Sequence, residues 1–139
     1  MKQEEAAEIV SLFCRLNMNA RRDMPIRSSE MGLLILVSKN EGQITPVQAA
    51  EYFHITKPMV TAMMRSLVAK KLLGKSPSLE DKRSYYLSTT ADGKKLVDQA
   101  WSEYNKTIQI LQNGMGQSAF VALMEGLSTA NAIMMKNGR

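Results

Sequence analysis

Two helix-start signals in close succession constrain the fold of this chain more than any other feature. Thr45-Pro46 places a capping residue before a proline at the first helical position, where the missing N–H of proline costs nothing. Thr56-Lys57-Pro58 repeats the signal after a brief connection at His54-Ile55, and this second helix runs to about Lys71. Two capped helices of this size, joined by a turn of three or four residues, form a helix-turn-helix unit. The apolar positions expected to be buried are Val47, Ala49, Ala50 and Phe53 in the first helix, and Val60, Met64, Leu67 and Val68 in the second.

The hydrophobic period changes directly after this unit. Residues 72–77 and 84–89 are predicted to be two strands, with Tyr85, Leu87 and Thr89 on one face of the second. The segment 78–83 between them is polar and has a charged tip. We therefore expect a β-hairpin wing beside the helix-turn-helix.

Amphipathic helices are predicted on both sides of this central unit. Residues 3–22 carry one apolar stripe, and a second helix is capped by Ser28 or Ser29 and ends near Asn40. Thr90 is expected to cap a long helix to about Asn113, and residues 117–136 form the last one. The predicted fold is mainly α with a small β-hairpin, a winged helix-turn-helix whose terminal helices form a dimerisation bundle.

Three of these helices carry apolar faces that the central unit does not need. Pairing them across a two-fold axis would bury them between two chains, whereas an intrachain bundle in a monomer is the alternative. On the dimer interpretation, residues 1–25 are an N-terminal dimerisation helix, 26–95 the winged helix and 96–139 the C-terminal dimerisation helices.

Positive charge is concentrated in the middle of the chain. The net charge is +5, and nine Lys and Arg face four acids between Thr45 and Lys95, so the whole excess lies there. Such a block suits a polyanionic partner, although a scattered solvated surface has the same count. With 45% hydrophobic residues the chain is too apolar for a disordered polyelectrolyte.

The helix that starts at Lys57 would supply the contacts to double-stranded DNA, because an α-helix fits the major groove and reads bases from its leading residues. Arg65 could bind guanine bidentately or grip a phosphate, and Met59 and Ala62 could meet thymine methyl groups. The alternative is that Thr56 only caps the helix and Lys57 is only a solvated charge. The predicted contact residues are Thr56, Lys57, Pro58, Met59, Thr61, Ala62 and Arg65.

The hairpin tip Asp81-Lys82-Arg83 places an acid two residues before an arginine. A guanidinium in a narrow A·T-rich minor groove is stabilised by the negative potential there, and a nearby carboxylate can orient it. We therefore predict that Asp81, Lys82 and Arg83 form a second DNA contact.

The run from Ile26 to Leu96 resembles the multiple-antibiotic-resistance regulator (MarR) family of winged-helix transcriptional regulators. The matching pieces are 26–30, 44–50, 56–61, 67–73, the wing 81–84 and 89–93. The resemblance implies a homodimer closed by the first and last two helices, with recognition helices in successive major grooves and wings on flanking minor grooves. It also implies a transcriptional repressor that binds a pseudo-palindromic operator. Lys71 and Thr89 stand where the family usually has Gly and Leu, and Ala62 where many members carry a long polar or basic side chain.

Many members of that family bind small, often aromatic, anionic ligands in a crevice between the dimerisation helices and the winged helix. Met24, Met31, Trp101 and Tyr104 are the residues that could line such an effector crevice here, although a stripe of this kind is more often core. Cys14 lies on or beside the first helix's stripe, and we expect a buried core cysteine rather than a redox sensor.

Other classes of function are disfavoured by the sequence. His54 is the sole histidine and Cys14 the sole cysteine, so no metal cluster or catalytic pair is indicated, and neither an enzyme nor a cofactor is predicted. No signal peptide and no run of about 18 apolar residues is present, which predicts a cytoplasmic protein that binds no membrane. A winged-helix module for protein interaction, without specific DNA binding, is the alternative function.

Overall fold

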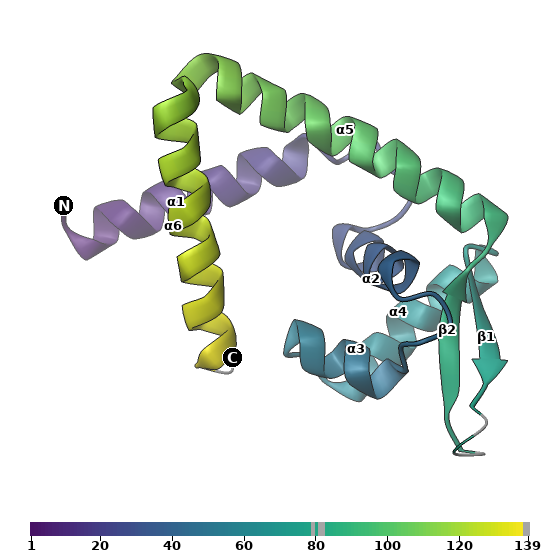
Figure 1. The fold of residues 1–139 in the computed structure, drawn as a ribbon. Helices are drawn as coiled ribbons and strands as arrows, with labels where there is room; N and C mark the ends of the chain where they lie inside the picture. Colours follow the sequence, from purple (N-terminus) through teal and green to yellow (C-terminus); the bar gives the residue numbers. More distant parts are fainter. Residues whose placement is uncertain (79, 81–82, 138–139) are drawn as a thin grey trace.

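The structure is a computed structural model that describes residues 1–78, 80 and 83–137. It consists of six helices and one two-stranded antiparallel sheet within these residues. Figure 1 shows α2, α3, α4 and the hairpin gathered into one unit, from which α1 and α5 extend away, while α6 turns back from the far end of α5 so that its last turns approach α3. The elements are α1 (Gln3–Asn19), α2 (Ser28–Lys39), α3 (Pro46–Phe53), α4 (Lys57–Ala69), β1 (Leu73–Pro77), β2 (Tyr85–Thr89), α5 (Ala91–Met115) and α6 (Gln117–Lys136).

The hydrophobic core lies inside the winged-helix unit. Residues of α2, α3, α4, the hairpin and the first turns of α5 share one cluster of buried side chains. Two predicted core positions are wrong: Val47 is 47% exposed and Val68 is 36% exposed. Both lie on helix flanks that point away from the centre of the cluster. The side chains with no exposed surface include Leu33, Leu34, Val37, Val60, Leu67 and Leu87.

The helix starts follow the predicted capping chemistry in three of four cases. The hydroxyls of Thr45, Thr56 and Thr90 each accept a hydrogen bond from a backbone N–H in the first turn of α3, α4 and α5. For α2 the prediction is wrong, because Arg27 is the capping residue and Ser28 is already helical. There the carboxylate of Glu30 accepts from the backbone N–H of Arg27 at 3.0 Å, which replaces a serine cap.

The wing is anchored to the helices along its second strand. The register pairs Leu73 with Thr89 and Pro77 with Tyr85. Leu87 also forms an isolated antiparallel bridge with Ile44, in the link between α2 and α3. The base of the hairpin is therefore continuous with the helix-turn-helix, beside which β1 and β2 lie (Figure 1).

A tight joint connects α4, the wing and α5. Lys71 has a φ of 61° in the left-handed region, which glycine adopts at lower cost. The hydroxyl of Thr90 donates to the Lys71 carbonyl at 2.7 Å, and the Thr90 N–H donates to the Leu72 carbonyl at 3.1 Å. Thr89 donates from its backbone N–H and its hydroxyl to the carboxylate of Glu41. The two positions at which the sequence departs from its resemblance, Lys71 and Thr89, thus both lie in this joint.

The terminal helices expose much of their apolar surface. In α1 no residue is buried, and Ile9, Val10 and Leu16 are all more than half exposed. Cys14 is exposed as well, so the expectation of a buried cysteine is wrong for the single chain, because α1 has little of the chain to pack on. In α6 only Phe120 is buried.

By length and composition alone, α6 could cross a membrane, and it is the one such helix in the described part of the chain. It carries Glu125 near its middle, followed by Ser128, Thr129 and Asn131. A carboxylate at the centre of a bilayer is costly. These polar residues favour an apolar face that packs on protein.

Candidate nucleic-acid interface

The capping residue of α4 and its buried positions determine which of its side chains face outward. Thr56 caps the helix by accepting from the Met59 N–H at 3.3 Å, so its hydroxyl has the predicted structural role. Val60, Met64 and Leu67 point into the core, which turns the opposite face outward. Lys57, Pro58, Ala62 and Arg65 are exposed there, and Met59 is 53% exposed.

The exposed side chains of α4 border one shallow hollow of about 380 Å³. It is lined by Lys57, Pro58, Thr61, Ala62 and Arg65, five of the seven residues predicted for this helix. Thr61 is half-buried, and its hydroxyl donates to the Lys57 carbonyl at 3.0 Å. Its oxygen can therefore still accept a hydrogen bond but its proton is engaged within the helix. The hollow presents two cations and a small Ala62 floor that an outside ligand could approach closely.

The wing carries only part of its predicted site in the described structure. Arg83 is exposed in the turn before β2, whereas Asp81 and Lys82 lie outside the described residues, so their predicted role stays a prediction. One link was missed by the sequence analysis: the Tyr85 hydroxyl donates to the sulfur of Met64 at 3.2 Å. Lys75 lies 4.9 Å from the centre of the Tyr85 ring. The Tyr85–Met64 hydrogen bond joins the wing to α4, whereas the Lys75–Tyr85 contact lies within the hairpin. The first of these contacts therefore links the two candidate surfaces.

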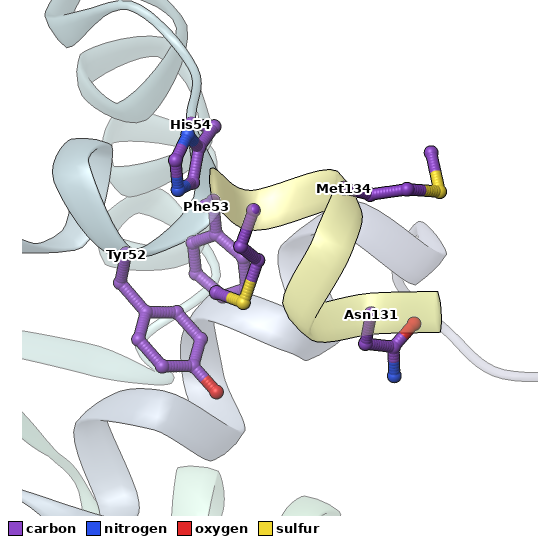
Figure 2. Close-up of a pocket in the computed structure, with 6 residues that line it drawn as sticks. Tyr52, Phe53, His54, Asn131 and Met134 are labelled. Carbon is purple, nitrogen blue, oxygen red and sulfur yellow. The ribbon is translucent and has the colours of Figure 1, made fainter. Parts of the chain in front are cut away.

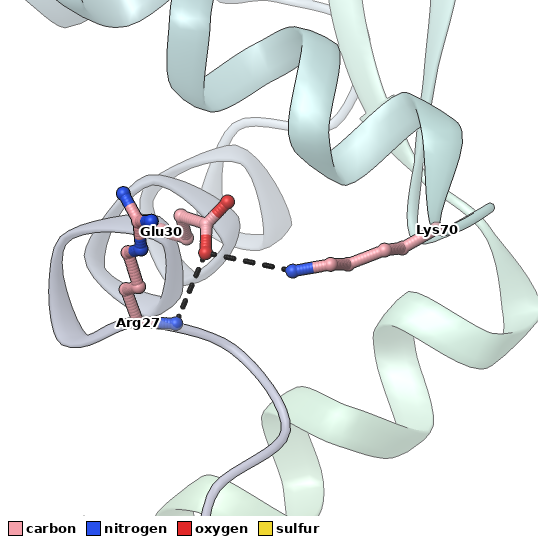
Figure 3. Close-up of polar contacts among 3 residues, drawn as sticks. All are labelled: Arg27, Glu30 and Lys70. Carbon is pink, nitrogen blue, oxygen red and sulfur yellow. Dashed lines mark hydrogen bonds and ion pairs between the residues drawn. The ribbon is translucent and has the colours of Figure 1, made fainter.

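A buried carboxylate beside α4 was also missed. Glu30 on α2 is only 4% exposed and lies 3.8 Å from the ammonium of Lys70, at the end of α4 (Figure 3). Burial by itself raises the pKa of Glu30. Hydrogen bonds from Ser66 and from the Arg27 backbone, together with the charges of Lys70 and Arg27, outweigh it and hold the pKa below the ordinary glutamate value. An acid three residues into a helix start is the only sequence signal that could have indicated it.

Two of the four residues predicted for an effector crevice, Met24 and Trp101, border different hollows. Met31 is 1% exposed and belongs to the core, so it lines nothing. Met24 borders a hollow between the α1–α2 link and the end of α4, and Trp101 borders a different one near Lys94. Tyr104 is half-buried, with the Arg21 guanidinium 3.9 Å above its ring. An effector site stays a prediction that this residue set does not define.

Another hollow lies between the end of α3 and the end of α6 (Figure 2). Its volume is about 350 Å³, and it is open and largely apolar, lined by Phe53, Met134 and Met135 among others. His54, at its edge, is exposed and has a left-handed φ of 54° where α3 ends. Across residues 1–78, 80 and 83–137, no three His, Cys, Asp or Glu side chains lie together as metal ligands would.

Comparison with known proteins finds matches to the fold of this chain but none to its sequence. No family model and no curated protein matches the chain by sequence. Solved structures match it over nearly its whole length. FabT of Streptococcus pneumoniae in complex with DNA has a TM-score of 0.78 at 19% identity and covers 96% of this chain and 97% of its own. A MarR protein from Peptoclostridium difficile has a TM-score of 0.80 at 16% identity, and the match covers 96% of this chain and 87% of the MarR protein. The chain has the MarR fold.

The MarR fold confirms the predicted architecture at both the centre and the ends of the chain. A third structure, BpsR of Bordetella bronchiseptica, has a TM-score of 0.76 at 18% identity and covers 91% of this chain and 98% of its own. In BpsR, DNA binding is regulated by 6-hydroxynicotinic acid. Since coverage extends beyond the winged helix, the placement of the long terminal helices also follows the MarR fold. The DNA and the small molecule belong to those proteins.

Proposed function

We propose that this chain is a MarR-family transcription regulator that binds double-stranded DNA in a sequence-specific manner. The observation that carries the proposal is the outer face of α4, where Lys57, Ala62 and Arg65 are exposed beside the wing. Their side chains do not belong to the core cluster. A helix with this face matches the dimensions of the major groove. The same fold in the DNA complex of FabT supports this use of the surface.

The two surfaces have different chemistry toward a duplex. On α4, Arg65 would contact a guanine edge or a phosphate, and the small Ala62 would let the helix come close to the base pairs. At the wing, the exposed Arg83 would enter the minor groove, where the potential is most negative over A·T-rich sequence. Both contacts lie on one rigid unit, because the Tyr85 hydroxyl joins the wing to Met64 of α4.

The proposal includes a homodimer on a pseudo-palindromic operator. Support comes from the apolar side chains of α1, α5 and α6, such as Leu16 at 57%, Ile110 at 71% and Met134 at 72% exposed. Burying a Leu or Ile side chain fully stabilises by about 1.5–3 kcal/mol, so a few of them suffice to hold two chains together. On this proposal residues 1–25 and 96–139 are the dimerisation segments, 26–95 is the reader, and the protein acts in the cytoplasm, by repression.

The DNA-binding proposal is tested with a fluorescent duplex taken from upstream of the chain's own gene, by footprinting and by anisotropy at several salt concentrations. Wild-type protein is expected to protect an A·T-rich inverted repeat and to lose roughly 10³-fold in affinity between 50 and 200 mM salt, if about six phosphates are contacted. Arg65→Gln should weaken binding, while Lys106→Gln, an exposed cation on α5 paired with Glu103, should not. A wild-type protein that binds no duplex at low salt would favour the protein-interaction alternative.

The dimer is tested separately by sedimentation equilibrium. Leu16→Asp places a charge in the apolar stripe of α1 and should shift the population toward monomer at micromolar concentration. Ser11→Asp is the matched control, since Ser11 is exposed on the polar side of the same helix. Wild-type protein that sediments as a monomer would refute the dimer without deciding whether the winged helix binds DNA.

A further inference from the structure

One edge of α4 carries a line of residues that runs past the proposed base-reading face. Ala62, Ser66 and Lys70 follow at four-residue spacing, so they lie one above another along the helix. Ala62 belongs to the outer hollow of α4 and also to a second hollow of about 240 Å³. The second hollow includes Ser66, Lys70 and the start of α2, so the proposed DNA surface is continuous with it.

Cations dominate the surface on the far side of this line. Arg27 and Lys70 border the second hollow and also a third one of about 620 Å³, next to the α1–α2 link. Arg21 and Arg22 are added there, so the two hollows together present four cations against the single carboxylate of Glu30. The positive surface therefore extends well beyond Arg65, along the flank of α4 that faces α2.

Glu30 holds the Lys70 ammonium and the backbone of Arg27. Its buried carboxylate accepts from the backbone N–H of Arg27 at 3.0 Å and lies 3.8 Å from the Lys70 ammonium (Figure 3). The Lys70 side chain is nevertheless 46% exposed, and Arg27 is exposed. An ammonium steered by a buried carboxylate and still open to solvent can bind an outside anion without first losing its position.

Resting on the proposed DNA binding, we propose that Arg27 and Lys70 form an additional contact to the DNA backbone, on the phosphates beside the groove occupied by α4. A helix seated in the major groove has a sugar–phosphate wall on each flank. The α2 flank presents cations and the small polar side chain of Ser29, which suit phosphate oxygens rather than base edges, whereas the Ser66 hydroxyl already donates to Glu30. Arg27 and Lys70 would thus add affinity and fix the orientation of the reader without adding sequence preference.

The salt dependence of affinity tests this contact, because each phosphate contact adds about 0.9 to the slope of log affinity against log salt. The probe is an A·T-rich palindromic duplex of about 30 base pairs, titrated with wild type, Arg27→Gln, Lys70→Gln and the control Lys106→Gln. In a dimer each single substitution removes two contacts, so the slope should fall by about 1.8 for Arg27→Gln and for Lys70→Gln, and stay unchanged for Lys106→Gln. The loss should be similar on a scrambled duplex.

A structural role alone would give a different result. Lys70→Gln leaves Glu30 without its nearby ammonium and can lower the melting temperature, but a merely destabilised reader loses affinity with an unaltered slope. Arg27→Gln keeps the backbone N–H that binds Glu30, so it separates the two effects. Unchanged slopes in both variants, with wild type and Arg65→Gln behaving as proposed, would overturn this contact and leave the proposed function intact. If wild type binds no duplex, both proposals fail together.

Discussion

Gly93 in the first turn of α5 offers the sharpest test of how the reader is held together. A Cβ atom at this position would lie 2.2 Å from the carbonyl oxygen of Leu72 and 3.2 Å from its carbonyl carbon. Ordinary contact between such atoms begins near 3.4 Å, so about 1 Å of movement is required. The obstacle is backbone and cannot rotate away as a side chain would. Gly93→Ala must therefore push α5 off the turn between α4 and β1.

The expected cost follows from two opposing terms. Alanine in place of glycine inside a helix normally stabilises by about 0.5–1 kcal/mol. Overpacking against fixed atoms costs typically 1–3 kcal/mol, and here it also stretches the bond from the Thr90 N–H to the Leu72 carbonyl. The net loss, with the stretched hydrogen bond included, should be roughly 1–2 kcal/mol. At roughly 3 °C per kcal/mol, the melting temperature should fall by about 3–6 °C.

Thermal and urea unfolding followed by circular dichroism measure this loss. Gly114→Ala is the matched control in the same helix, since nothing lies within 4 Å of a Cβ there, and it should be neutral or slightly stabilising. Gly93→Ala should also weaken DNA binding, because Leu72 immediately precedes the wing. If both variants melt at or above the wild-type temperature, the close contact between α5 and the Leu72 carbonyl is wrong.

Three further predictions concern single residues. Lys71→Gly should raise stability by about 0.5–1 kcal/mol in urea unfolding, because the left-handed φ of 61° no longer opposes a Cβ, and a decrease would argue against that backbone conformation. Glu30 has a pKa in the folded protein below its value in the unfolded chain, so its contribution to the free energy of unfolding is present above the unfolded pKa and is lost as pH falls through the folded pKa. The difference in stability between wild type and Glu30→Gln should therefore narrow on acidification from pH 6 to about 3. A constant difference would contradict this. Thr45→Ala should cost about 1 kcal/mol by removing the cap that the Gln48 N–H donates to at 3.2 Å, and an unchanged urea midpoint would refute that role.

Local signals in the sequence predicted most of the architecture. The capping threonines 45, 56 and 90 fixed three helix starts, because a hydroxyl before a proline or a helical period has few alternatives. The alternation around Leu87 predicted the second strand, in which Leu87 is the one buried residue. The outward residues of α4 followed from its apolar positions, since the period of a helix assigns the remaining face to solvent.

Long-range chemistry could not be read in the same way. The cap of α2 came from Glu30, whose burial depends on Ser66 and Lys70, more than thirty residues away in sequence. Met31 looked like a crevice residue, but its neighbours on α2 place it in the core. The contact between Tyr85 and Met64 joins two elements whose separation no local pattern encodes. The predicted burial of Val47 and Val68 was wrong because a residue near a helix end lacks the flanking apolar repeat that would show whether it faces the core or solvent.

The joint at the start of α5 determines how far the two winged helices of a dimer could move relative to each other. With 25 residues, α5 is about 37 Å long, and it leaves the reader through a turn clamped by Thr90 and Gly93. A helix of that length works as a lever: a tilt of about 5° at the clamped end sweeps the other end by about 3 Å, close to the 3.4 Å rise of one base pair. In a dimer closed at those distant ends, the stiffness of this short turn therefore sets the tolerance for the gap between half-sites, and operators lengthened by a single base pair should already be bound less tightly.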